Sequence, residues 1–143
     1  MAIIKTKLRI SISDQDIDHI IEQAIPGMKV WCNKVKYVSS HTKSKCVHTG
    51  TLNDKDAAGR ILLHMSNGDR IFLYNYWNDR YYCISKNKII KGMRKILRKE
   101  AKLWAFAKPY LGIYPNMPYI DGHIANDAVQ YGLFGKIIYK IND

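Results

Sequence analysis

Residues 86–104 are the segment that most restricts how this chain can fold, because apolar side chains recur along them at helical spacing. These side chains are Ile89, Ile90, Met93, Ile96, Leu97, Ala101 and Trp104. The pattern predicts an amphipathic helix with Ser85 as its N-cap. Its apolar face needs a partner surface elsewhere in the fold, while the Lys and Arg side chains occupy the other face.

The positive charge of the chain is concentrated in the same segment. Residues 86–102 contain eight cations and one acid, Glu100, so they carry +7 of the net charge of +11. The cations are Lys86, Lys88, Lys91, Arg94, Lys95, Arg98, Lys99 and Lys102. One acid cannot neutralise eight cations through pairs within the helix, so their repulsion lowers stability unless an anion binds. Alternatively, these cations form the solvated face of an amphipathic helix and bind no partner.

Residues 14–23 have the opposite bias, with four acids and no Lys or Arg. An acidic and a basic element on one small domain permit attraction within or between subunits. Because a small domain with this many aromatic side chains has surface to bury, we also expect self-association, for which symmetric dimers are the commonest form.

Alternating and helical patterns elsewhere predict strands and two further helices. Strands are expected at residues 5–12, 30–38, 60–65, 70–77, 80–84 and 136–141, and helices at 13–25 and 121–132. Asn67-Gly68 suits a tight turn, which predicts a hairpin between the strands on either side of it. The segment from Ser39 to Gly59 lacks periodicity and predicts a long, mobile loop.

Local residues define the ends of the first helix. Ser13 is a suitable N-cap, and Asp16 three residues later can complete a capping box. Pro26-Gly27 is expected to end the helix. With 143 residues, within the usual ~100–200 for one domain, the sequence predicts a single α+β domain over residues 1–143. We expect an antiparallel sheet of about five to six strands with three helices.

Known catalytic patterns are absent from the sequence, which has no GxxxxGK[ST], GxGxxG or GxSxG. His41, Cys46 and His48 come nearest to a metal site, but a fourth ligand is missing. Cys32 and Cys83 are expected to be small core residues rather than nucleophiles. We therefore expect a non-enzymatic protein without a metal or cofactor.

The chain shows no feature of export or membrane insertion. No apolar run approaches the ~20 residues that cross a bilayer, and no apolar stretch follows the first charges. The three cysteines form no disulfide framework. We expect a cytoplasmic protein without membrane contact.

Residues 74–82 contain a cluster of rings beside the basic helix. Burial in a core or interface is one explanation of such rings. Stacking on a nucleotide base is the other, with Arg80 able to pair with a phosphate. With two arginines of the helix, the predicted ligand-binding residues are Tyr76, Trp77, Arg80, Tyr82, Arg94 and Arg98.

Three segments carry a family resemblance, namely ISDQDIDHII (12–21) with the following Trp31-Cys32, residues 60–97, and ANDAVQYGLFG (125–135). Together they resemble a group of small proteins encoded by phages and other mobile elements of Gram-positive bacteria. The group is associated with anti-defence proteins, including Thoeris anti-defence sponges that sequester cyclic ADP-ribose-type signals. The resemblance implies a place in the cytoplasm of the infected or lysogenic bacterial host. Family members carry acidic residues in the helix after the hairpin, whereas this chain has Lys and Arg there, which permits a changed partner.

These observations together predict a phage-derived, non-enzymatic anti-defence protein that binds and sequesters an anionic nucleotide immune signal. That signal would be a cyclic ADP-ribose-type molecule or a cyclic oligonucleotide. The alternative is a nucleic-acid-binding or anti-CRISPR-type protein whose basic helix contacts a phosphate backbone or a CRISPR effector. A third alternative is that the positive face docks on an acidic partner protein or on a neighbouring subunit.

Overall fold

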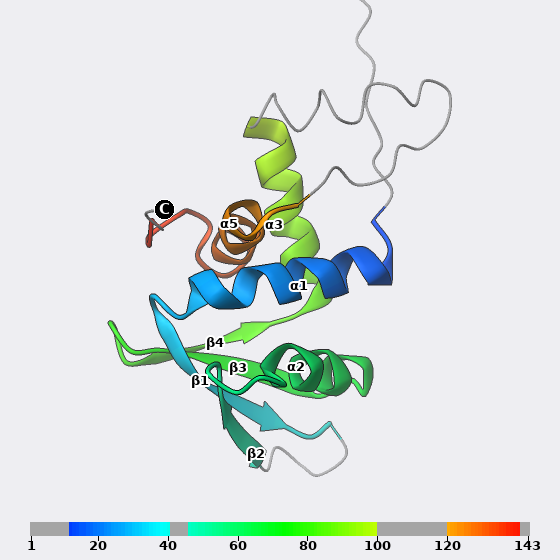
Figure 1. The fold of residues 1–143 in the computed structure, drawn as a ribbon, viewed down its shortest axis with the longest axis vertical. Coiled ribbons are helices and arrows are strands. Elements are labelled where there is room, and N and C mark those ends of the chain that lie inside the picture. The colour runs from blue at the N-terminus through cyan, green and yellow to red at the C-terminus, as the bar shows by residue number, and fades with distance from the viewer. Residues whose placement is uncertain (1–11, 41–45, 100–119, 141–143) are drawn as a thin grey trace, which may run out of the picture.

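A four-stranded antiparallel sheet organises the residues that the computed structural model describes, which are 12–40, 46–99 and 120–140 (Figure 1). The strands pair in the order β2-β1-β3-β4, and their bounds are β1 (Cys32–Val38), β2 (Cys46–Thr51), β3 (Arg70–Asn75) and β4 (Arg80–Ile84). The helices are α1 (Asp14–Met28), α2 (Ala57–Ser66), α3 (Lys86–Lys99) and α5 (Gly122–Phe134). The α+β class and the single domain are therefore confirmed.

The sheet has one buried face and one exposed face. Val35 of β1 pairs with Leu73 of β3, and both side chains belong to the core. The next pair along, Lys34 with Tyr74, points the other way, as the period of two requires. Helices α1, α2, α3 and α5 all supply side chains to the core, which includes Ile71, Leu73 and Ile84 of the sheet. All the described helices thus contribute to a core that lies on one face of the sheet.

The start of α1 follows the prediction from its capping residues. The Ser13 hydroxyl accepts a hydrogen bond from the Asp16 backbone N–H, and the Asp16 carboxylate accepts one from the Ser13 N–H. This reciprocal pair is a capping box, and its acid suits the positive end of the helix. The helix continues past Pro26 to Met28, slightly beyond its predicted end.

The predicted strand of residues 60–65 is wrong, because these residues belong to helix α2. Ile61 is buried in the core, and Leu62 and Met65 pack against it, which is a helical spacing. A short apolar run does not distinguish a strand from a helix. Gly68, with φ +78°, follows the end of α2, so the Asn67-Gly68 pair ends a helix instead of closing a hairpin.

Two other segments also differ from the prediction. Strand β2 and the start of α2 lie within the predicted loop of residues 39–59. As an edge strand, β2 carries few of the apolar side chains that announce a buried strand. Residues 136–140 form no strand, because the Gln130 side chain takes the backbone hydrogen bonds of Ile138 and Tyr139.

The predicted strand of residues 5–12 lies almost wholly outside the described residues. The part of the chain that the structure describes has four strands and four helices, instead of the predicted five to six strands and three helices.

Helices α3 and α5 touch through their backbones at two glycines. A Cβ atom at Gly92 would overlap the carbonyl oxygen of Ala128, and one at Gly132 would overlap the carbonyl oxygen of Lys88. No side chain fits at either position, so the two helices approach more closely than larger residues permit. This contact fixes which face of α3 turns to the core.

We predict that Gly92→Ala lowers the free energy of unfolding by about 2 kcal/mol or more, because the added methyl group forces apart two packed backbones. Gly59→Ala on α2 is the matched control, since nothing lies within 4 Å of its Cβ position. Alanine has the better helix propensity, so this control should gain about 0.5–1 kcal/mol. Urea unfolding measures both changes, and equal effects of the two substitutions would contradict the close contact.

Candidate anion-binding surfaces

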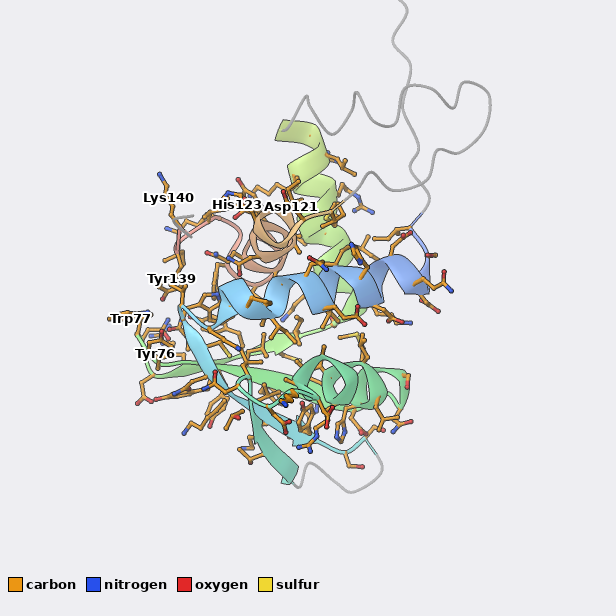
Figure 2. All side chains as sticks on the ribbon, in the orientation of Figure 1. Tyr76, Trp77, Asp121, His123, Tyr139 and Lys140 are labelled. Atoms are coloured by element: carbon orange, nitrogen blue, oxygen red, sulfur yellow. The ribbon has the colours of Figure 1, made fainter. Side chains whose placement is uncertain are left out.

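The six predicted ligand-binding residues lie on three separate parts of the fold. Tyr76 and Trp77 lie in the turn between β3 and β4, Arg80 is the first residue of β4, and Tyr82 lies further along β4. Arg94 and Arg98 lie on α3. Figure 2 shows Tyr76 and Trp77 together at one end of the sheet, whereas α3 extends away from the sheet in Figure 1. The six side chains therefore do not line one pocket.

The rings of the β3–β4 turn are tied to the segment that joins α1 to β1. The Tyr76 hydroxyl donates to the carbonyl oxygens of Lys29 and Val30, and the Trp77 indole N–H donates to that of Val30 at 2.8 Å. Trp77 is nevertheless 66% exposed, and Arg80 is exposed on the same turn. The turn thus offers a fixed indole surface to solvent, and an exposed arginine follows it in the chain.

Tyr82 points to the covered face of the sheet and does not join that surface. It pairs across the sheet with the buried Leu73. Its ring packs edge-on against Phe134 of α5, with 4.7 Å between the ring centroids. The Tyr82 hydroxyl accepts a hydrogen bond from the Asn78 amide at 2.7 Å. These contacts place Tyr82 in a structural role.

Helix α3 forms as its sequence predicts. The Ser85 hydroxyl accepts a hydrogen bond from the Lys88 backbone N–H at 3.2 Å, as an N-cap does. Ile89, Met93 and Ile96 are buried in the core. The predicted helix of residues 86–104 is described as far as Lys99.

Three lysines of α3 are held by nearby groups. Lys86 forms an ion pair with Asp14 of α1 at 2.9 Å, and this pair links the basic helix to the acidic one. Lys88 donates to the carbonyl oxygen of Cys83. Lys95 donates to the carbonyl oxygen of Gly135, and its ammonium lies 5.2 Å from the Tyr131 ring centroid.

Lys91, Arg94 and Arg98 are the other cations of α3 whose side chains the structure describes, and we call them the cation stripe. All three side chains are exposed. Their spacing of three and four residues places them on one side of the helix. Within the described residues, no carboxylate lies within ion-pair distance of any of them. Among the described residues, the cation stripe is therefore left without an acidic partner and can meet an external anion.

A second positive surface, which the sequence analysis missed, lies on the exposed face of the sheet. Lys34 pairs with Tyr74 in neighbouring strands, and Tyr74 pairs in turn with Tyr81. Lys36 lies on the same face opposite Phe72. The alternation of residues 32–38 already placed Lys34 and Lys36 on one face of a strand. The predicted hairpin paired β3 with residues 60–65 instead of with β1, so the lysines were not placed beside the tyrosines.

A hollow of about 470 Å³ between α1 and α5 does not suit an anion. It is lined by Gln23, Pro26, Gly27, Val30, Asp121, Gly122 and His123. The Asp121 carboxylate caps α5 through the Ile124 N–H at 2.9 Å, and the His123 ring lies 3.8 Å from the Asp127 carboxylate. Figure 2 shows Asp121 and His123 away from the rings of the β3–β4 turn.

Two buried side chains of the described residues have polar atoms without a hydrogen-bond partner, the indole N–H of Trp31 and the amide of Asn126. Both polar atoms of the Asn126 amide are buried and make no hydrogen bond. By contrast, the buried Asn75 amide donates to the Tyr139 hydroxyl at 2.8 Å, and Gln130 is fully bonded to the C-terminal segment. Nothing in the structure explains why the Asn126 amide is buried without a hydrogen bond.

The described residues contain no group of three or more His, Cys, Asp or Glu side chains that could hold a metal ion. Burial raises the pKa of the Cys32 thiol to about 12, which opposes formation of a thiolate.

Comparison with protein-family models, with curated proteins and with solved structures finds no match to this chain. No helix of the described segments is long and apolar enough to span a bilayer.

We predict that iodoacetamide modifies Cys83 at pH 8 at least about tenfold faster than Cys32 in the folded protein, because only the thiolate reacts. Cys32 is 0% exposed, whereas Cys83 is half-buried on the exposed face of the sheet. Mass spectrometry of the labelled peptides measures both rates, and the denatured protein supplies the control in which they converge. Equal rates in the folded protein would contradict the burial of Cys32.

Proposed function

We propose that this protein binds the phosphate backbone of a nucleic acid through the cation stripe of α3, and that it acts by binding rather than by catalysis. The observation that carries this proposal is that Lys91, Arg94 and Arg98 are exposed on one side of a helix with no carboxylate beside them in the described residues. Arginine offers a planar fork that matches two phosphate oxygens, and lysine adds a point charge.

The length of the cation stripe favours an extended polyanion. Arg98 follows Lys91 by seven positions, which is about 10 Å along a helix that rises ~1.5 Å per residue. Successive phosphates of one strand in duplex DNA are ~3.4 Å apart along the helix axis. The stripe therefore has the length to meet two or three phosphates in a row, whereas a mononucleotide would engage only part of it.

The overall charge supports the same function. A net charge of +11 on 143 residues attracts polyanions over distances longer than any single contact. Only Lys86 among the described cations of α3 is paired with a carboxylate, so the positive charge of this helix is mostly uncompensated within the described chain. Binding of phosphates relieves this repulsion and releases counterions from the nucleic acid.

We predict that the double substitution Arg94→Gln/Arg98→Gln weakens binding to a fluorescein-labelled oligonucleotide roughly tenfold or more at ~0.1 M salt, because two phosphate contacts are lost. Fluorescence anisotropy measures the affinity. Both side chains are exposed, so the unfolding temperature should stay close to that of the original protein.

The matched control is Lys29→Gln/Lys55→Gln, which removes the same charge from exposed residues outside α3. Its affinity should fall less than threefold, since only the general attraction is reduced. An equal loss in the two double variants would show that total charge, and not the cation stripe, governs binding.

The β3–β4 turn favours a second candidate function, the sequestration of a small anionic nucleotide. The observation behind it is the 66% exposed indole of Trp77, fixed by its hydrogen bond to Val30 and followed by the exposed Arg80. A base can stack on the indole while the guanidinium meets a phosphate. The resemblance to phage-encoded anti-defence proteins supports a role in withdrawing a cyclic ADP-ribose-type or cyclic oligonucleotide signal. That role, self-association and a cytoplasmic location stay predictions.

For this second candidate we predict micromolar binding of at least one such cyclic nucleotide by the original protein and by Trp77→Phe, which keeps a ring. Trp77→Ala should bind at least about fivefold more weakly, because the stacking surface is lost. Isothermal titration calorimetry with a panel of these nucleotides measures the affinities. The absence of binding heat at micromolar concentrations for the whole panel would overturn this candidate.

A further inference from the structure

The exposed face of the sheet combines aromatic rings with lysines in adjacent strands. We call the five side chains Lys34, Lys36, Phe72, Tyr74 and Tyr81 the open sheet face. The strand pairings align Lys34 with Tyr74 and Tyr81 in one row, and Lys36 with Phe72 in the next. The residues between them, among which Val35, Leu73 and Tyr82 point to the helices, make up the covered face.

The rings of the open sheet face lie close together and are accessible. The centroids of Tyr74 and Tyr81 are 5.1 Å apart, with 50° between their planes. Tyr81 is 46% exposed, and Tyr74 is half-buried. The Tyr74 hydroxyl donates to the Asp79 carboxylate, which holds this ring in place. Two neighbouring, oriented rings thus face the solvent.

Lysine ammoniums lie directly over these rings. Lys34 Nζ is 4.6 Å from the centroid of Tyr74, and Lys36 Nζ is 5.7 Å from that of Tyr81. The strands β1 to β4 contain four Lys or Arg residues and no Asp or Glu. Asp79, at the turn, is already engaged by Tyr74. The open sheet face is therefore positive, and its charge complements an anion that also carries flat rings.

We infer that the open sheet face binds single-stranded nucleic acid, with bases stacked on Tyr81 and Tyr74 and phosphates near Lys34 and Lys36. This inference rests on the proposed function, because it assumes that nucleic acid is the ligand, and it specifies the strand form. Unpaired bases present the flat surfaces that aromatic side chains on a sheet can stack on, whereas a duplex keeps its bases inside. Stacking tolerates any base, so we expect little sequence preference.

Sheet stability alone is the competing explanation of these residues. Cross-strand aromatic pairs and cation–π contacts stabilise sheets in proteins that bind no nucleic acid. A second copy of the chain is the other occupant that could cover the face, since α1 carries exposed acids such as Asp18 and Glu22. Sheet stability alone predicts no change in single-strand binding by Tyr81→Thr, and a second copy predicts that Cys83 becomes protected as protein concentration rises.

The experiment compares Tyr81→Thr, which keeps a residue that suits a strand, with Tyr81→Phe, which keeps the ring. The probes are fluorescein-labelled oligo-dT and oligo-U of about 12 nucleotides and a duplex of the same length. We expect Tyr81→Thr to bind both single strands about five- to a hundredfold more weakly and Tyr81→Phe to bind them within about twofold of the original protein. Duplex binding should be unchanged in both variants.

Two controls accompany the affinities. Leu63→Ala removes an exposed apolar side chain on α2, outside the open sheet face, the cation stripe and the β3–β4 turn, and should leave single-strand binding unchanged. Alkylation of Cys83, which pairs with Phe72 on the same face, should slow when either single strand is bound. Urea unfolding checks that Tyr81→Thr remains folded at the temperature of the assay.

If Tyr81→Thr binds the single strands as the original protein does, this inference is wrong and the proposed function of the cation stripe stands. If the original protein binds neither the single-stranded oligonucleotides nor the duplex, both the proposed function and this inference are wrong. If Cys83 becomes protected as protein concentration rises without nucleic acid, a second copy covers the face and the inference is wrong.

Discussion

The contact between the backbones of α3 and α5 decides where the positive charge of this protein points. Gly92 and Gly132 let the two helices approach until no side chain fits between them. With Gly92 turned towards α5, Met93 and Ile96 enter the core and the cation stripe is directed outward. A larger residue at the contact would separate the helices and expose apolar side chains of α3. The orientation of the charge is thus a consequence of packing.

One-sided packing of the sheet has a similar consequence. The side chains of the helices that enter the core lie on the face that carries Val35, Leu73 and Ile84, so the alternate residues of the same strands remain on the other face. Those alternate residues include two tyrosines and two lysines in register, and the strands contribute no carboxylate to balance them. The elements that build the core therefore also produce a positive surface with exposed rings.

Local interactions explain which parts of this structure could be predicted from the sequence. The capping box of Ser13 and Asp16 and the apolar stripe from Ile89 to Ile96 depend on residues a few positions apart, and both form as predicted. The hairpin predicted at Asn67-Gly68 is wrong, because a glycine with positive φ ends a helix as readily as it forms a hairpin.

The binding surfaces depend on pairing between distant residues, which is why the sequence revealed them only in part. Arg94 and Arg98 could be predicted from helical spacing alone. Tyr82 could not be assigned to the covered face without Phe134 of α5, and Lys34 could not be placed beside Tyr74 without the pairing of β1 with β3.

The salt dependence of binding by the unmodified protein shows how many phosphates its cations contact. If the cation stripe and the two lysines of the sheet contact phosphates, the logarithm of the association constant for oligo-dT should fall linearly with the logarithm of the salt concentration. The slope should be about −3, since the stripe meets two or three phosphates, the two lysines meet one each, and each contact on a single strand contributes ~−0.7. A slope near zero, or no binding at low salt, would contradict the claim that uncompensated cations on this fold recognise a nucleic acid.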